Sequence, residues 1–203
     1  MKMNRAIWVC GMGLILAMTS GCAFGTRHAK VTYPPASVTA KSFTNAPAAG
    51  VTGRIALEPF DDVRADKQIV GHVRNGFGMK TADVVCDDQD IAALVNTALR
   101  GELQKAGYEV LEAGSPTAGD APVLGGSLTT LYCDAYMNYD GSATLVVHLS
   151  RAGNVVFKKT YEGKGSSGMN WAATGSGYGD SLSLAVVDVI AVMMRDLPTA
   201  LRQ

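Results

Sequence analysis

Residues 123–163 read VLGGSLTTLYCDAYMNYDGSATLVVHLSRAGNVVFKKTYEG, and this stretch decides the fold. It contains three strand-like runs, Val123–Met137, Ser142–Arg151 and Val155–Gly163. The runs are separated by two turn signals, Asn138-Tyr139-Asp140-Gly141 and Ala152-Gly153-Asn154. In the middle run Leu145, Val147 and Leu149 alternate with more polar residues and share one face. The pattern predicts an antiparallel meander with one buried face.

The residues on either side of the meander add strands and two helices. Strands are predicted at Gly53–Phe60, Gln68–Val73, Thr81–Cys86 and Tyr108–Leu111. Seven apolar residues at helical spacing predict a first helix: Ile91, Leu94, Val95, Ala98, Leu99, Leu103 and Ala106. Asp87 or Asp88 is its expected N-terminal cap, and Gly107 its expected end. A second helix is predicted from Ser181 to about Leu197, ended by Pro198. The fold class is therefore α+β: one domain, residues 51–203, in which a mainly antiparallel sheet packs against two helices.

The N-terminus has the three parts of an export signal. Lys2 and Arg5 form a positive start, residues 6–18 are uncharged and mostly apolar, and residues 19–21 are small. Cys22 follows directly, so residues 1–21 resemble the signal peptide and lipobox of bacterial lipoproteins. That resemblance implies cleavage before Cys22 and a covalent diacylglycerol and N-acyl (palmitate-type) lipid on it, which would anchor the chain in a membrane. Two alternatives are an ordinary secretory signal with a chance cysteine and an uncleaved anchor.

Residues 22–50 are predicted to form a flexible tether behind the lipidated cysteine. They contain Pro34-Pro35, Pro47 and many small residues without apolar periodicity. An alternative is that Val31 to Tyr33 lies along the domain as an edge strand.

The composition excludes some classes of protein. The 203 residues are 47% hydrophobic and 18% charged, with no net charge, so a basic nucleic-acid surface is not expected. His28, His72 and His148 have no metal-site spacing, and no metal is expected. No Gly-x-Ser-x-Gly stretch provides a nucleophile, and we expect no enzymatic activity.

Two further groups of residues have more than one interpretation. The stretch 163–168 (GKGSSG) matches a dinucleotide fingerprint, but antiparallel flanking strands favour a turning loop. Met169 and Trp171 beside it are either a ligand or partner contact or a cover for the core. The acids between Asp61 and Asp66 alternate with Arg64, which is typical of a solvated face; a partner-docking edge and an acid/base pair are the alternatives.

Several segments together resemble the YajG family of bacterial lipoproteins. They are Pro59–Arg64, Gly71–Gly78, Leu103–Tyr108, the meander and the last helix. More loosely, they resemble small periplasmic domains of the TolB-N-terminal and transport-auxiliary type. The resemblance implies a lipoprotein with no assigned reaction, and Cys22 is the residue it carries over. Ala23 stands where Asp would mark retention in the inner membrane, so the implied location is the outer membrane, facing the periplasm.

Cys86 and Cys133 would be the thiols left in an oxidising compartment. Strand alternation points both inward, which predicts a Cys86–Cys133 disulfide; two separate buried thiols are the alternative.

The last helix is apolar nearly all round, which indicates deep packing or a face for a partner or second copy at Val192, Met193 and Met194. The expected function is a non-catalytic accessory or structural component of a cell-envelope assembly, with an envelope protein or a second copy as partner. The alternative is a carrier of a small ligand or lipid, as in an auxiliary lipoprotein of an envelope transport system. A cavity of several hundred Å³ lined by the last helix would favour the carrier.

Overall fold

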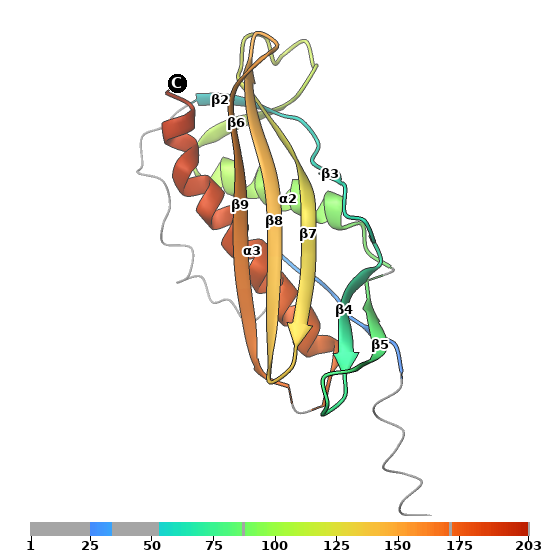
Figure 1. The fold of residues 1–203 in the computed structure, drawn as a ribbon. Coiled ribbons are helices and arrows are strands. Elements are labelled where there is room, and N and C mark those ends of the chain that lie inside the picture. Colours follow the sequence, from blue (N-terminus) through green and yellow to red (C-terminus); the bar gives the residue numbers. More distant parts are fainter. Residues whose placement is uncertain (1–24, 34–52, 87, 171, 203) are drawn as a thin grey trace, which may run out of the picture.

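The computed structural model describes residues 25–33, 53–86, 88–170 and 172–202. The strands are β1 (Arg27–His28), β2 (Gly53–Leu57), β3 (Asp61–Asp62), β4 (Ile69–Arg74), β5 (Lys80–Val85), β6 (Tyr108–Glu112), β7 (Val123–Ala135), β8 (Asn138–Arg151) and β9 (Asn154–Met169). The helices are α2 (Ile91–Lys105) and α3 (Gly175–Ala200). One large, mostly antiparallel open sheet with two helices forms a single domain, which confirms the predicted α+β class (Figure 1).

The meander is longer than predicted. Strands β7, β8 and β9 pair antiparallel, and Leu124 lies opposite Leu149. The predicted turn at residues 138–141 lies inside β8, and the chain reverses at Tyr136-Met137 instead. The predicted glycine loop at 163–168 is likewise part of β9. The other edge of β7 was not predicted: the short strands β2, β3 and β4 run parallel to it.

Glycines let α3 lie directly on the meander. A Cβ atom on Gly163 would be 2.3 Å from the backbone nitrogen of Val189, and one on Gly165 would be 2.2 Å from the carbonyl oxygen of Ser181. Strand backbone and helix backbone are therefore in contact where these residues meet. The Ser181 hydroxyl lies 2.9 Å from the Gly165 carbonyl oxygen, to which it donates a hydrogen bond.

Both ends of α3 differ from the prediction. The helix begins at Gly175, six residues before Ser181, where the Thr174 side chain accepts a hydrogen bond from the Gly177 N–H. It continues through Pro198 to Ala200, because a proline in the last turn removes one backbone donor without preventing the turn.

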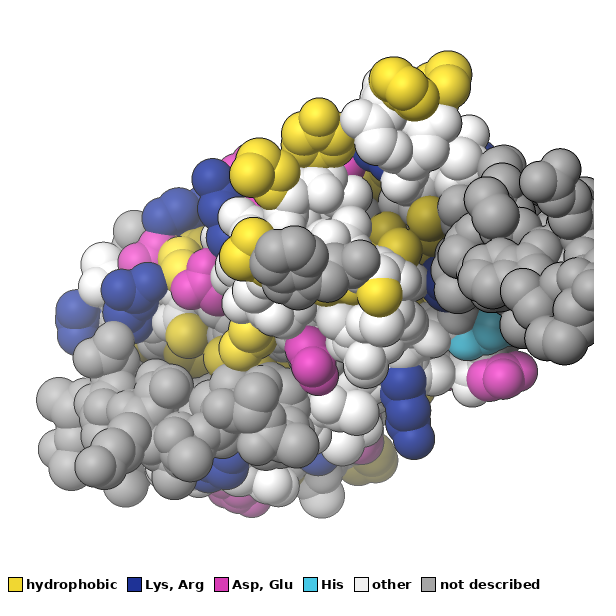
Figure 2. Space-filling model, turned by 90° about the horizontal axis from the view of Figure 1, so that it is seen from below, with side chains coloured by type: hydrophobic (Ala, Val, Ile, Leu, Met, Phe, Trp, Pro, Cys, Tyr) yellow, Lys and Arg dark blue, Asp and Glu magenta, His cyan; other side chains and the backbone are white. Residues whose placement is uncertain are grey.

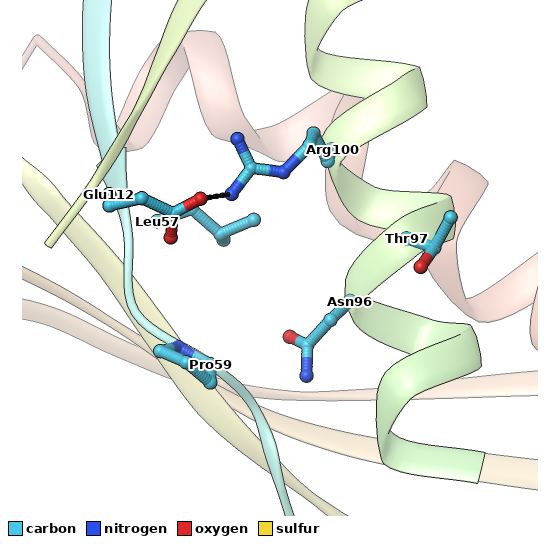
Figure 3. Close-up of a pocket in the computed structure, with 6 residues that line it drawn as sticks. All are labelled: Leu57, Pro59, Asn96, Thr97, Arg100 and Glu112. Carbon is cyan, nitrogen blue, oxygen red and sulfur yellow. Dashed lines mark hydrogen bonds and ion pairs between the residues drawn. The ribbon is translucent and has the colours of Figure 1, made fainter. Parts of the chain in front are cut away.

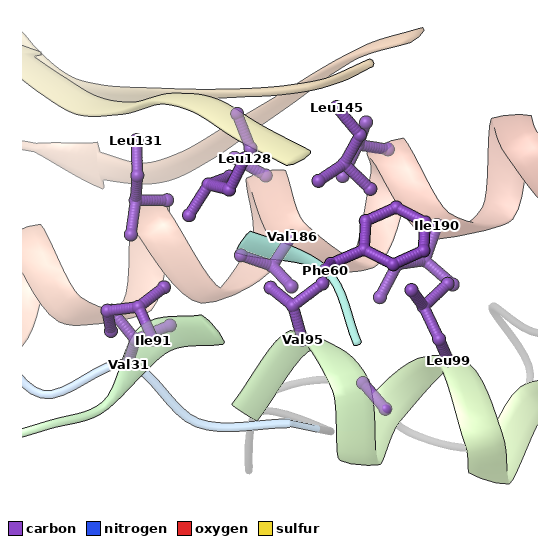
Figure 4. Close-up of a cluster of buried hydrophobic side chains, with 14 of the residues drawn as sticks. Val31, Phe60, Ile91, Val95, Leu99, Leu128, Leu131, Leu145, Val186 and Ile190 are labelled. Carbon is purple, nitrogen blue, oxygen red and sulfur yellow. The ribbon is translucent and has the colours of Figure 1, made fainter. Parts of the chain in front are cut away.

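The core lies between the sheet and the two helices (Figure 4). Helix α2 presents its predicted stripe inward, with Val95 and Leu99 buried beside Phe60. Leu145 from the meander and Ile190 from α3 pack into the same cluster. The N-cap of α2 is Asp90 rather than Asp87 or Asp88, since its carboxylate accepts the Ala93 N–H at 2.9 Å.

Part of the predicted tether is built into the domain. β1 pairs parallel with β5, where Arg27 lies opposite Val84. Val31 is buried, and both of its backbone polar groups bond the Gln89 side chain, at 2.7 and 2.9 Å. Residues 31–33 therefore lie along the domain, as the alternative predicts, but the edge strand is formed by Arg27–His28. Cys22, the rest of residues 1–24 and residues 34–52 lie outside the described residues.

Candidate functional site

A small groove separates α2 from the chain that leaves β2 (Figure 3). It has a volume of about 240 Å³ and is lined by Leu57, Pro59, Asn96, Thr97, Arg100 and Glu112. Its polar groups bond one another or the backbone. Arg100 pairs with Glu112, and the Asn96 amide accepts the Phe60 N–H at 2.8 Å and donates to the Phe60 carbonyl at 3.2 Å. The volume is below the roughly 300–1,000 Å³ that is typical of ligand pockets. The residues of this groove instead hold the loop after β2, through the two hydrogen bonds between Asn96 and Phe60.

A larger groove of about 500 Å³ runs along the outer face of α2. Its floor is made of small and apolar residues that include Ala93, Leu94 and Gly101, and Tyr33 closes one side. Burial, with the Glu102 carboxylate beside it, raises the pKa of the Tyr33 hydroxyl well above its usual range. Tyr33 therefore stays a neutral hydroxyl at any physiological pH. This groove has the size and lining for an apolar ligand.

The loop between β3 and β4 is less solvated than predicted. Arg64 is buried and holds Asp62 with two bonds, Nε to Oδ1 at 2.9 Å and Nη2 to Oδ2 at 2.7 Å. Burial would raise the pKa of the Asp62 carboxyl, but the hydrogen bonds and charge of Arg64 outweigh burial and lower it. Asp66 is exposed and accepts the N–H groups of Gln68 and Ile69, which lower its pKa. The acids are thus used in local structure, one of them in a buried ion pair.

Cys86 and Cys133 are buried but free, so the predicted disulfide is not formed in the structure. Cys133 in β7 is paired with Gly71 of β4, whereas Cys86 follows β5 on the far side of β4. An intervening strand separates the Cα atoms by roughly 10 Å, beyond the limit of about 7 Å for a disulfide. Each thiol has its own contact, Cys86 with Gln89 at 3.0 Å and Cys133 with Ser181 at 3.8 Å. Both side chains do point inward, as strand alternation predicts.

The partner face predicted on α3 is wrong. Met193 and Met194 are 1% and 6% exposed, and Val192 is half-buried against the core. Both methionines belong to the hydrophobic core cluster, and Val192 packs against it. Within the described residues, α3 alone is long and apolar enough to cross a membrane, but 61% of its most apolar window is buried in the domain. The deep-packing interpretation holds for α3.

Hydrophobic side chains gather instead at one end of the domain, which we call the apolar end. It consists of Phe77 and Met79 in the β4–β5 turn, Tyr136 and Met137 in the β7–β8 turn, and Met169 at the end of β9. Figure 2 looks at this end and shows hydrophobic side chains projecting from it. Met169 was predicted, whereas the other four were missed, although a phenylalanine inside the turn Asn75-Gly76-Phe77-Gly78 is a signal in the sequence. Trp171 lies outside the described residues.

The remaining candidates have structural contacts. The glycine stretch runs in an antiparallel strand, so it does not open a helix that could receive a phosphate. Asp188 accepts the Lys164 N–H at 2.9 Å and thereby fastens α3 to β9. Among the described residues no three His, Cys, Asp or Glu side chains are grouped as metal ligands.

Comparison with known proteins shows the fold. No family model matches the sequence, and no curated protein matches it. The crystal structure of protein XCC0632 from Xanthomonas campestris, assigned to the DUF330 family model, is 12% identical and has a TM-score of 0.56. The match covers 89% of this chain and 97% of that one, so the two share a fold.

Two more distant matches are named as a dodecamer and as a lipoprotein. The PelC dodecamer from Paraburkholderia phytofirmans is 14% identical over 74% of this chain and 92% of that one, with a TM-score of 0.43. Lipoprotein GNA1162 from Neisseria meningitidis is 16% identical over 57% and 84%, with a TM-score of 0.36. The similarity to both is too low to support an argument about function.

Proposed function

We propose that this protein is a lipoprotein of the YajG type, anchored through Cys22 in the outer membrane and facing the periplasm. There it acts by binding, as a non-catalytic accessory or structural component of an envelope assembly. The observation that carries the proposal is the export signal ending in Thr19-Ser20-Gly21-Cys22. It stands three residues before the first described residue of the domain, Gly25.

The arrangement of polar and apolar groups supports binding rather than chemistry. The charged side chains in the described grooves are used in ion pairs, Arg100 with Glu112 and Lys105 with Glu102. The imidazole of His72 likewise lies 2.9 Å from the Asp83 carboxylate. Exposed hydrophobic side chains, in contrast, are concentrated at the apolar end, and such concentrations are typical of contact surfaces.

The test begins with the anchor. Native protein is purified from envelopes in mild detergent, and the N-terminal peptide is measured by mass spectrometry. We expect Cys22 at the N-terminus with three acyl chains, and no acyl modification of a Cys22→Ser variant. The retained material is identified in the same preparation. A stoichiometric envelope protein supports an assembly component, whereas an unmodified Cys22 or a soluble wild-type protein contradicts the proposal.

The groove along α2 favours a second candidate, a carrier of a lipid or other apolar ligand. Its volume of about 500 Å³ and apolar floor suit an acyl chain. Organic extraction of the purified protein should then yield one defined ligand. Gly101→Leu fills the groove, and no heavy atom lies within 4 Å of a Cβ placed at this glycine, so the variant should fold. Loss of the ligand from that variant supports the carrier, and an empty extract of the wild type rejects it.

A further inference from the structure

The apolar end is built from ordered turns. Of the eight large hydrophobic residues that are exposed in the described chain, five belong to it, and Phe77 is 90% exposed. Asn75 organises the β4–β5 turn: its N–H donates to the Met79 carbonyl, and its own carbonyl accepts the Gly78 N–H. Its side-chain oxygen accepts the N–H groups of Phe77 and Met79, each at 3.0 Å. Phe77 is thus held outward by a turn whose N–H groups are largely bonded within the protein.

The second turn is tied in the same way. The Asn170 N–H donates to the Met137 carbonyl at 2.8 Å, and its side chain donates to the Ala135 carbonyl at 3.3 Å. Arg74 and Asp134, 3.2 Å apart, join the two turns. Unbonded backbone groups make a segment costly to move from water into an apolar medium. These turns carry large hydrophobic side chains and have already bonded much of their backbone, so entry into such a medium costs them little.

The N-terminal chain leads to this end. Strand β1 runs parallel to β5, and Arg27 is opposite Val84. Five residues back from Val84 is Met79 at the apolar end, and five residues back from Arg27 is Cys22. An extended chain of five residues reaches about 17 Å, the same length as five residues of β5. Five extended residues are therefore long enough to bring Cys22 to the level of Met79.

We infer that the apolar end contacts the membrane. Its side chains lie at the boundary between headgroups and acyl chains, in the same leaflet that holds the lipid of Cys22. This inference rests on the proposed lipid anchor. The partner is the bilayer because the anchor is attached on this side: Cys22 is five residues from Arg27, so its lipid lies within about 17 Å of the start of β1. Phe77 and Met137 enter the interface, and the domain stands upright on the membrane with the β8–β9 turn pointing away.

A fluorescence measurement on the lipidated full chain in phospholipid vesicles tests this inference. Phe77→Cys is labelled with an environment-sensitive dye, and Val155→Cys, at the opposite end and 60% exposed, is the matched control. Cys86 and Cys133 are buried and do not compete for the label. We expect a blue-shifted emission at position 77, most of which is lost when the vesicles contain nitroxide-labelled phospholipid, and neither effect at position 155. Met137→Cys repeats the measurement in the second turn if Phe77→Cys fails to fold.

A second measurement removes the anchor. In the mature chain, without residues 1–21 and carrying Cys22→Ser, residual binding to the same vesicles should fall about tenfold on Phe77→Ser, equal to about 1.4 kcal/mol. Val155→Ser should leave it unchanged.

The outcomes separate the two proposals. A lipidated, vesicle-bound protein whose probe at position 77 stays aqueous overturns the membrane contact and leaves the anchor intact. A probe that is shielded without lipid, in proportion to protein concentration, shows that a second copy covers the apolar end and also overturns the inference. A protein without lipid on Cys22 refutes the anchor, and with it this inference.

Discussion

The contact between α3 and the meander makes a specific prediction for Gly163→Ala. The new Cβ would lie 2.3 Å from the Val189 nitrogen and 2.4 Å from the Ala185 carbonyl oxygen, about 1 Å closer than ordinary contact. Both neighbours are helix backbone and cannot rotate away, so α3 must shift as a unit. That shift would disturb the fully buried Leu182 and Ile190.

Overpacking of this kind costs about 1–3 kcal/mol, and the lower flexibility of alanine in the unfolded chain returns less than about 1 kcal/mol. We expect a net loss of about 1–2 kcal/mol in the free energy of unfolding. At about 3 °C for each kcal/mol in a domain of this size, the Tm falls by about 3–6 °C.

Urea unfolding of the Cys22→Ser chain, followed by far-UV circular dichroism, measures both quantities. The matched control is Gly101→Ala in α2, where no atom lies within 4 Å of the new Cβ. Because alanine favours an exposed helix over glycine, this variant should gain about 0.5–1 kcal/mol. A Gly163→Ala variant within about 0.5 kcal/mol of the wild type, with an unchanged m value, would refute the backbone contact between β9 and α3.

Three further predictions concern an ion pair, two thiols and a helix cap. Asp62→Asn should destabilise the domain near neutral pH, because it leaves the buried Arg64 without its carboxylate. Since Arg64 lowers the pKa of Asp62, this stability is present above the ordinary carboxyl pKa of about 3.9 and is lost as the pH falls through the lower folded value. The difference between variant and wild type in denaturant unfolding should therefore shrink from pH 7 to pH 3. Unreduced native protein should resist alkylation at Cys86 and Cys133, because burial hides both thiols and raises the pKa of Cys133 to about 12. Both thiols should react once the protein is unfolded. Unreduced, unfolded protein that does not react would show that a Cys86–Cys133 disulfide is present. Asp90→Ala should cost about 1 kcal/mol of unfolding free energy through the lost cap, and an unchanged Tm would contradict the assigned start of α2.

Local patterns in the sequence were enough to predict α2 and the meander. The stripe of α2 lies on one face with a period of 3.6, and the alternation in β8 has a period of two. Both signals arise within the element itself, because one face is buried and the other is not.

The glycine-rich segments could not be interpreted this way. Gly163 and Gly165 occupy β9, and Gly177 and Gly179 occupy the first turns of α3. Taken alone, such residues favour turns, so the sequence predicts a turning loop at these positions. Glycine is needed at these positions because the backbone of another segment lies too close for a side chain. A Cβ on Gly179, for example, would lie 2.5 Å from the Lys30 carbonyl oxygen, 149 positions away in the sequence. A requirement set by a distant backbone leaves no periodic signal.

The site predictions failed for a related reason. The apolar residues of α3 were open to a partner only if nothing in the chain covered them, but Met193 and Met194 are buried in the core of the domain. Phe77 and Met137 were overlooked because isolated hydrophobic residues in turns form no stripe; only the parallel pairing of β4 with β7 brings their turns to the same end.

The first and last described elements also act as a clasp. The Thr32 N–H donates to the Ser183 hydroxyl at 2.9 Å across 151 positions of sequence, and Gly175 fits against the backbone of His28. If the chain is exported N-terminus first, as the proposed lipid anchor requires, it cannot close this clasp until α3 has followed. A chain cut short before α3 would lack one side of the clasp in any compartment.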